Sequence, residues 1–465
     1  MTQNQALSIL KTGANVFLTG EPGSGKTHTV NEYVAYLRRH GVEPAITAST
    51  GIAATHISGM TIHSWSGIGI KKKLDKYDLD KISSSSYVGK RVRRAKILII
   101  DEVSMLSAET LSMIDAVCRE VKQNPEPFGG LQMILVGDFF QLPPILNVKA
   151  ESEKQAVLIE NSPARAGGPA RFACDSSVWA RLNLVVCYLT EQYRQDDRAF
   201  LSVLSSIRRD VFNNEHLRHI QARKVEPARA PKNIPQLFSH NIDVDRVNDE
   251  TLAKLAGKPR EFFMSSRGPA ALVTALKKGC LSPETLSLKE GAAVMFTKNN
   301  LFGGFVNGTL GTVVEFAGGC PIIKIRSGRR IAVEPMDWTV EENGAARARI
   351  SQLPLRLAWA ITVHKSQGVS LDEAVVDLSQ VFEFGQGYVA LSRVRRLSGL
   401  HLLGWNERAF RVHPEVLAKD GSFRAASGGA ETAFTNISSS ELSKMHKNFL
   451  KACLPAGPRR KKSLL

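Results

Sequence analysis

The segment GEPGSGKT at residues 20–27 constrains the fold of this chain more than any other stretch of its sequence. It follows the apolar run NVFLT at 15–19, and after it the apolar residues between Val30 and Leu37 recur with the spacing of a helix face. A G-x-x-x-x-G-K-[ST] pattern between a strand and a helix is typical of a loop that binds nucleotide phosphates. The sequence therefore predicts an α/β domain that binds a nucleoside triphosphate.

The residue types in this loop suit a polyphosphate. Glycines can adopt backbone angles that turn several N–H groups toward one anion, and the start of the following helix adds its positive end. Lys26 can reach the β- and γ-phosphates, and the Thr27 hydroxyl can ligate Mg²⁺. The predicted nucleotide-binding residues of the loop are Gly20, Gly23, Ser24, Gly25, Lys26 and Thr27.

Two further apolar runs end in polar residues. KILIIDEVSML places Asp101 where it can hold Mg²⁺, and Glu102 where it can polarise an attacking water. ILVGDFFQLPP places Gln141 where it can contact a γ-phosphate or its water. Each pattern alone would fit an ordinary loop. Because a phosphate loop precedes both of them in the chain, we interpret them as parts of the same nucleotide-binding site. Lys26, Asp101, Glu102 and Gln141 are therefore candidate catalytic residues, with Thr27 and Asp101 as metal ligands.

The order of apolar runs predicts the fold class. Buried runs that alternate with segments long enough for helices indicate parallel, doubly wound sheets. The first set is expected at 15–19, 45–49, 96–100 and 132–136, and a second set without a phosphate loop at 184–189, 235–239, 373–378 and 400–404.

The pattern changes between 290 and about 350, where short apolar runs are separated by glycine pairs and by SGRR. Such spacing is typical of hairpins and predicts a small all-β insert. A long polar loop is expected at 147–170. The expected domains are 1–182 for the first α/β domain, 183–289 with 351–412 for the second, 290–350 for the insert and 413–465 for a C-terminal extension.

Charge indicates the kind of partner. The net charge of +17 and a pI near 9.7 favour an anionic polymer. Residues 71–96 hold ten Lys and Arg against three Asp, and the final PAGPRRKKSLL is basic and predicted to be disordered. Six scattered cysteines without zinc spacing indicate reduced thiols. Because no signal, transit or membrane-spanning pattern is present, we expect a cytoplasmic protein that does not associate with membranes.

The order of the motifs resembles that of the Pif-one family of superfamily-one helicases and their RecD-like relatives. The resemblance runs from Gln5 to about residue 405. The motifs are GEPGSGKT, TASTGIAATHISGMTIHSW, LIIDEVSML, LVGDFFQLPP, LTEQYRQ, FSHNIDVDRVN, AWAITVHKSQGVSL and GYVALSRVRR. This resemblance implies two RecA-like domains with ATP between them, and a Src-homology-three-like insert. It also implies a wedge element at about 66–95 and movement from 5′ to 3′.

The resemblance also implies roles for single residues. Gln5 would contact the adenine, and Gly368 would line the nucleotide cleft. Arg194 and Arg393 would reach the γ-phosphate from the second domain. The implied single-strand track is lined by Thr50, His63, Ser239, His240, Asn241, His364, Lys365 and Ser366.

Three functions fit such a motor. The first is an ATP-dependent DNA helicase, acting on single-stranded DNA and forked duplexes as a monomer. The second is a nucleic-acid-stimulated ATPase that acts as a loader or switch without processive unwinding. The third is an inactive subunit, but it predicts loss of Lys26, Asp101, Glu102 or the arginines, and all are present. The VHKSQG and ALSR motifs in a second domain favour the helicase.

Overall fold

The computed structural model describes residues 1–57, 59–69, 71, 73–144, 171–191, 197–231, 234–298, 300, 302–305, 307, 309–325, 327–342, 345–364, 366 and 371–454. The predicted polar loop at 147–170 and the basic tail at 455–465 lie outside these residues. Arg194, Lys365 and Gly368 also lie outside them. No helix in the described part of the chain is long and apolar enough to cross a membrane.

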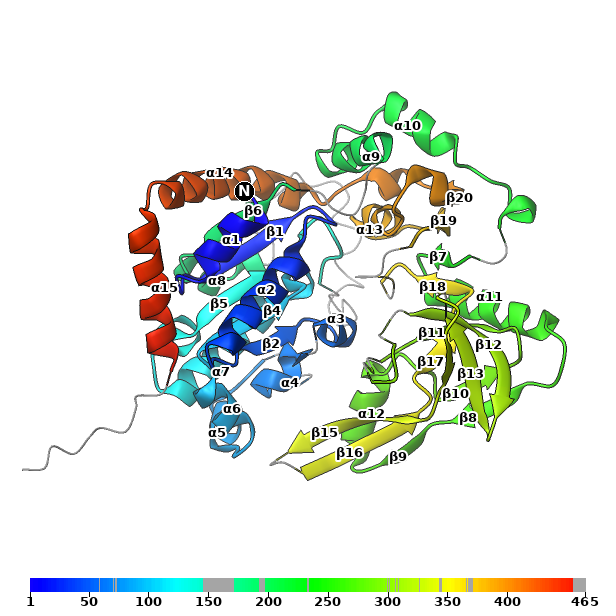
Figure 1. Ribbon diagram of the computed structural model, residues 1–465, viewed down its shortest axis with the longest axis horizontal. Coiled ribbons are helices and arrows are strands. Elements are labelled where there is room, and N and C mark those ends of the chain that lie inside the picture. Colours follow the sequence, from blue (N-terminus) through cyan, green and yellow to red (C-terminus); the bar gives the residue numbers. More distant parts are fainter. Residues whose placement is uncertain are drawn as a thin grey trace, which may run out of the picture.

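A six-stranded parallel sheet forms the first domain, with strand order β3-β2-β4-β5-β1-β6 (Figure 1). Leu98 and Ile100 of β4 enter one hydrophobic core, and Ile97 and Ile99 enter another on the opposite face. Strands buried on both faces read as continuous apolar runs, as predicted. The strands are β1 Val16–Gly20, β2 Ala45–Ala48, β3 Met60–Thr61, β4 Ile97–Asp101, β5 Gln132–Val136 and β6 Val185–Leu189.

Strand β6 corrects one expectation. The run at 184–189 was predicted to begin the second sheet, but β6 pairs with β1 from Val16↔Val185 to Gly20↔Leu189. The first domain therefore extends beyond residue 182. An apolar run specifies a buried strand, whereas the choice of sheet depends on which strand edge it can reach in space.

Helices surround the first sheet. On one face lie α1 Gln3–Leu10 and α2 Lys26–Arg39, and the core of the other face is built with α7 Ala108–Lys122. The basic segment between β2 and β4 folds into short helices, of which α5 and α6 pack against α7. These helices are α3 Gly51–His56, α4 Ile62–Ser66, α5 Lys76–Ser84 and α6 Val88–Arg94.

The second domain holds a smaller parallel sheet, with strand order β18-β7-β19-β20. Together the two parallel sheets confirm the predicted α/β class. The strands are β7 Gln236–Phe238, β18 Ala360–Thr362, β19 Ala374–Leu378 and β20 Leu400–Trp405. The accompanying helices include α9 Arg198–Arg208, α10 Asn214–Gln221, α11 Asn241–Lys254 and α13 Gln386–Ser392.

An antiparallel region interrupts the second domain and lies below it in Figure 1. It runs from β8 to β17 and is wider than the predicted 290–350, because β8 pairs with β10 and β9 pairs with β16. Helix α12 Ala270–Gly279 packs on β16. The strands are β8 Arg260–Phe263, β9 Ser265–Arg267, β10 Thr285–Leu288, β11 Ala293–Phe296, β12 Leu310–Ala317, β13 Cys320–Ile325, β14 Arg330–Ala332, β15 Met336–Glu342, β16 Ala345–Gln352 and β17 Leu355–Leu357.

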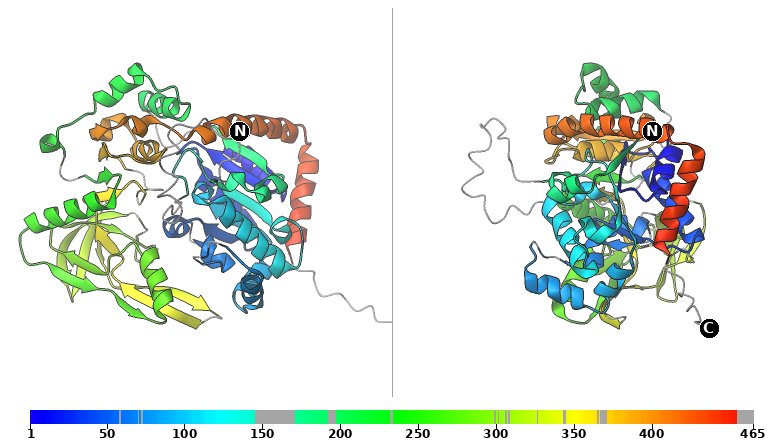
Figure 2. Two further views of the ribbon diagram at one scale, coloured as in Figure 1. Left: turned by 180° about the vertical axis from the view of Figure 1, so that it is seen from behind. Right: turned by 90° about the vertical axis from the view of Figure 1, so that its left-hand side faces the viewer.

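Two C-terminal helices return to the first domain, as both views in Figure 2 show. Helix α14 Pro414–Thr435 packs along β6, where the backbone N–H of Tyr188 donates to the Ser427 hydroxyl at 3.0 Å. Helix α15 Ser439–Cys453 then passes α1, with the His446 ring 2.9 Å from the Ser8 carbonyl oxygen. The extension therefore connects the second domain to the first, where it contacts β6 and α1.

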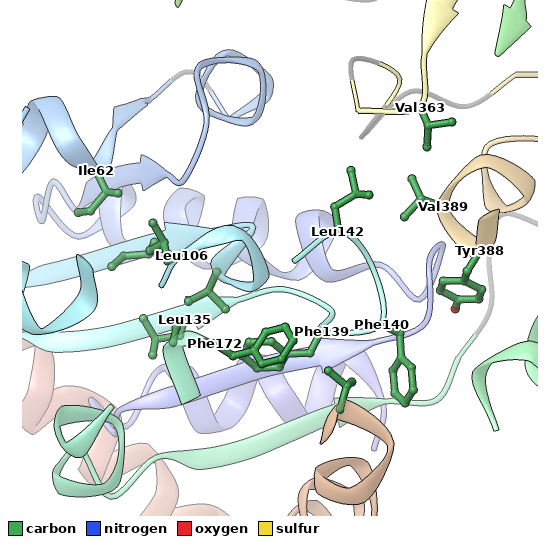
Figure 3. Packing of buried hydrophobic residues seen from close by; sticks show 14 of the residues in the cluster. Ile62, Leu106, Leu135, Phe139, Phe140, Leu142, Phe172, Val363, Tyr388 and Val389 are labelled. Carbon is green, nitrogen blue, oxygen red and sulfur yellow. The ribbon is translucent and has the colours of Figure 1, made fainter. Parts of the chain in front are cut away.

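One hydrophobic core spans both α/β domains. Phe139, Phe140 and Leu142, which follow β5, belong to the same cluster as Tyr388 and Val389 of α13. Figure 3 shows these side chains between the first sheet and α13. The packing fixes the loop after β5 against the second domain.

Candidate functional site: a nucleotide cleft between two parallel sheets

The phosphate loop connects β1 to α2 with the backbone that a cradle requires. Gly23 and Gly25 have φ values of 89° and 88°, which other residues rarely adopt. A Cβ on Gly20 would lie 2.7 Å from the Leu189 carbonyl oxygen of β6. The Lys26 ammonium donates to the Gly20 carbonyl at 2.7 Å, so its charge is held over the loop.

The loop also contains a buried polar atom that suits a ligand. Ser24 is fully buried, and its hydroxyl has no hydrogen-bond partner in the described part of the chain. Such a group is costly unless something satisfies it. Thr27 is exposed on the first turn of α2. The loop therefore fits a polyphosphate, and Thr27 is accessible to a metal ion.

Gln3, rather than Gln5, contacts the phosphate loop. The Gln3 amide donates to the Ser24 carbonyl at 3.1 Å. The Gln5 amide instead accepts from the Thr2 backbone at 2.8 Å and donates to Glu431 of α14 at 3.0 Å. Gln5 thus caps α1 and contacts the C-terminal extension. The contact of Gln5 with an adenine stays a prediction, because a hydrogen bond of Gln3 to the phosphate loop does not test it.

Asp101 and Glu102 stand at the end of β4, next to β5 and one strand removed from β1. Burial, and then the neighbouring Glu102 carboxylate, raise the pKa of Asp101 to about 7, while Lys26 opposes the shift. A cation bound here would favour ionised Asp101. Thr27 and Asp101 supply oxygen donors of the kind that Mg²⁺ takes beside phosphates and water. Glu102 has a left-handed φ of 52°, a backbone conformation that residues other than glycine rarely adopt.

Replacing Glu102 by glutamine should leave ATP binding nearly intact and lower ATP turnover by about a hundredfold or more, because the water loses its carboxylate. Steady-state hydrolysis and equilibrium nucleotide binding measure the two effects. Glu109→Gln, on the exposed first turn of α7, is the matched control and should keep full turnover. If the Glu102→Gln variant kept wild-type turnover, Glu102 would not be the residue that polarises the attacking water.

Gln141 and Arg393 meet across the two domains. The Arg393 guanidinium donates to the Gln141 side-chain oxygen at 3.3 Å, and the two residues are only 2% and 6% exposed. Arg393 follows α13, whose start approaches the loop after β5 so closely that a Cβ on Gly385 would lie 2.5 Å from the Phe140 carbonyl oxygen. The predicted arginine of the second domain therefore reaches the same sheet edge as the phosphate loop.

A buried charge network beside this contact was missed from the sequence. Arg208 of α9 donates to both carboxylate oxygens of Asp138 at 2.8 Å, and both residues are almost fully buried. The hydroxyls of Tyr188 and Tyr388 lie 2.8 and 3.3 Å from the same guanidinium. Burial alone would lower the pKa of Arg208, but Asp138 holds it well above its ordinary value. The network joins β6, the loop after β5, α9 and α13.

The described residues of the predicted single-strand track follow strand ends. Thr50 follows β2 and accepts from the Ala53 backbone, and His63 lies on α4 after β3. Burial lowers the pKa of His63, so its imidazole is neutral near pH 7. The carboxyl ends of parallel strands share one edge, so these residues lie on the edge that carries the phosphate loop.

The residues of the predicted track that belong to the second domain follow β7 and β18. The Ser239 hydroxyl and His240 Nδ1 are buried without a partner among the described residues, which suits a ligand. Burial lowers the pKa of His364, with Glu383 opposing. Ser366 is buried, and its hydroxyl donates to the Val363 carbonyl at 2.7 Å, so it shapes the turn. Asn241 begins α11, and its side chain lies outside the described part.

A phosphate loop on one parallel sheet and a buried arginine from the domain of the second sheet define a two-domain P-loop nucleoside triphosphatase. Comparison with known proteins narrows this class. The PIF1-like helicase family matches residues 3–199, and the family described as DNA helicase Pif1, 2B domain matches residues 272–316, inside the antiparallel region. The chain belongs to the PIF1-like helicase family.

Individual relatives cover nearly all of the chain. It is 39% identical to the ATP-dependent DNA helicase Pif1 of a Psychrobacter species, over 97% of this chain and 75% of that protein. It is 34% identical to the protein of that name from Bdellovibrio bacteriovorus, over 89% of this chain and 90% of that protein. The crystal structure of Pif1 helicase from Candida albicans superposes with a TM-score of 0.77 at 30% identity, covering 90% of this chain and 98% of that one. Bacteroides Pif1 with ADP-AlF4 gives 0.72 at 28% identity, covering 91% and 96%.

Proposed function

We propose that this chain is an ATP-dependent DNA helicase that moves 5′ to 3′ along single-stranded DNA and unwinds duplex or structured DNA. The observation that carries the proposal is the Gln141–Arg393 contact, because it brings the second domain to the edge of the first sheet that holds the phosphate loop and Asp101. A cleft that is complete only when both domains meet links hydrolysis to domain movement.

The chain's own residues have separate roles in hydrolysis. Lys26 neutralises the β- and γ-phosphates, Gln5 contacts the adenine, and Gln3 supports the loop through its hydrogen bond to the Ser24 carbonyl. Glu102 orients the attacking water, and Arg393, together with Arg194, stabilises the charge that develops in the transition state. Mg²⁺, which Thr27 and Asp101 would hold, supplies positive charge at the phosphates when bound.

Movement along a strand requires that both domains hold it. The residues after β2, β3, β7 and β18 belong to different domains but to equivalent sheet edges. Neutral imidazoles at His63 and His364 can each donate one hydrogen bond to a phosphate without reading bases. Closing the cleft would then shift one group of contacts relative to the other.

The solved relatives support this assignment. They include Bacteroides Pif1 bound to single-stranded DNA, and a complex that explains DNA unwinding at forked duplex by two coordinating Pif1 helicases. We propose that the present chain also binds single strands and forks, that it acts in the cytoplasm or nucleoid, and that one copy suffices for translocation. The mass of its complexes on tailed DNA measures that stoichiometry.

The second candidate is a loader or switch ATPase that binds DNA without unwinding it. Both functions predict hydrolysis stimulated by single-stranded DNA, so strand separation distinguishes them. The helicase should unwind a duplex with a 5′ tail and leave one with a 3′ tail intact.

Lys26→Ala should abolish both hydrolysis and unwinding because the main cation at the phosphates is lost. The assay measures ATPase rate with and without single-stranded DNA, and strand displacement on both tailed duplexes. Stimulated ATPase without displacement of either duplex would favour the loader. Displacement from the 3′ tail alone would overturn the proposed polarity.

A further inference from the structure

A basic surface lies at the edge of the first sheet opposite the phosphate loop. It is a groove of about 1390 Å³ between the end of α2, α4 and α6. Its lining includes Ala45, the first residue of β2, and Lys96, the residue before β4. Parallel strands begin at this edge, whereas the nucleotide cleft lies where they end. In Figure 1 α6 accordingly lies at the lower end of the first domain, away from α13.

Positive charge dominates the groove. Its lining contains Arg38, Lys90, Arg91, Arg94 and Lys96, against the single carboxylate of Glu43. Arg38 already neutralises Glu43, with its Nη2 2.6 Å from the carboxylate. The Arg91 guanidinium also has partners within the protein, because it donates to the Trp65 carbonyl at 2.7 Å and to the Ser64 carbonyl.

Three cations remain without a partner. Lys90, Arg94 and Lys96 are exposed, and none of their side chains makes a hydrogen bond or ion pair within the part of the chain that the structure describes. Lys90 and Arg94 lie one turn apart on α6 and therefore share a face. Lys122 lies nearby, and burial, and next the charge of Lys96, lower its pKa. An anion would relieve this repulsion.

The groove suits phosphates better than bases. Tyr87 lines it, but the Arg91 guanidinium covers its ring at 4.8 Å, and Trp65 is only 4% exposed. Stacking of bases needs an open aromatic face. The volume exceeds that of ordinary small-ligand pockets, which favours an extended polyanion.

We propose that this groove binds the sugar–phosphate backbone of a nucleic-acid segment that lies outside the single-strand track. The proposal rests on the proposed function, which supplies such segments at a fork. Two sources share this chemistry: the duplex arm and the displaced strand. We expect this binding to be independent of sequence, because it depends on cations that attract the phosphate backbone.

The test replaces the three unpaired cations together, as Lys90→Gln, Arg94→Gln and Lys96→Gln. Affinity is measured over a range of salt concentrations for a full fork, a 5′-tailed duplex without a displaced arm, and a single strand just long enough for the track. The matched control is Arg218→Gln, Lys444→Gln and Lys447→Gln, which removes the same charge from exposed positions outside the groove.

The groove variant should bind the fork about tenfold or more weakly, with a log–log salt slope smaller by up to about three units. Its affinity for the short strand, its strand-stimulated ATPase and its melting temperature should match wild type. Weaker binding of the 5′-tailed duplex as well would identify the duplex arm, and weakening confined to the full fork would identify the displaced strand.

Equal fork affinity and salt slope in wild type, groove variant and control would overturn the inference. If single-stranded DNA did not raise the ATPase rate of the wild-type protein, the proposed function itself would be contradicted. Failure of the groove proposal and failure of the proposed function are therefore distinguishable.

Discussion

Replacing Arg393 by alanine is expected to lower kcat for ATP hydrolysis by about 10³-fold or more while ATP binding changes little. Arg393 is 2% exposed and reaches Gln141 from the other domain. Its charge would act where negative charge develops in the transition state, so its loss should affect turnover more than ground-state binding. Steady-state kinetics and equilibrium nucleotide binding measure the two quantities.

Arg395→Ala is the control, because Arg395 lies two residues away, is exposed and pairs with Asp372 at 3.0 Å. It should keep wild-type turnover. A buried guanidinium also contributes to packing, so the melting temperature of Arg393→Ala must be recorded alongside. A lower melting temperature with unchanged kcat would make Arg393 a structural residue and contradict the proposed role.

Replacing Arg208 by methionine is expected to lower the free energy of unfolding by about 3–5 kcal/mol, because it leaves the Asp138 carboxylate buried without a countercharge. Asp138 is fully buried, and both of its carboxylate oxygens accept from Arg208. Chemical denaturation followed by two independent probes measures the change and shows whether the domains unfold together.

The double variant Arg208→Met, Asp138→Leu removes both charges and should recover most of the lost stability, since the desolvation penalty disappears with them. The exposed pair Arg246 and Glu250, with both side chains more than half exposed, is the control. Breaking it should cost less than about 1 kcal/mol. Equal costs for the two pairs would show that the Arg208 network contributes no more than a surface contact.

The local sequence pattern was sufficient to predict the phosphate loop and the buried strands of the first sheet. The glycine spacing at Gly23 and Gly25 requires the positive φ angles that the structure shows. The run at 96–100 predicted a buried strand, and the side chains of Ile97, Leu98, Ile99 and Ile100 enter two cores. Each of these features depends on neighbours within a few residues, so the sequence contains the necessary information.

Pairing between distant segments could not be predicted in the same way. The run at 184–189 reads as a buried strand in either sheet, and only its pairing with β1 decides between them. The strands at 260–288 are short, and their antiparallel partners lie up to about ninety residues away. Gln3 and Gln5 are chemically identical, and the direction of each side chain from α1 decides which one reaches the phosphate loop.

The sequence by itself determined that this chain binds a nucleotide, has parallel α/β domains and carries the motif series of a helicase family. Those properties depend on residue type and on short-range spacing, which fix backbone angles, burial and local charge. The tertiary structure alone decided that Arg393 meets Gln141, that Arg208 neutralises Asp138, and that three unpaired cations line one groove. These contacts join residues up to about 250 positions apart, so they exist only because packing of the two sheets brings distant parts of the chain together.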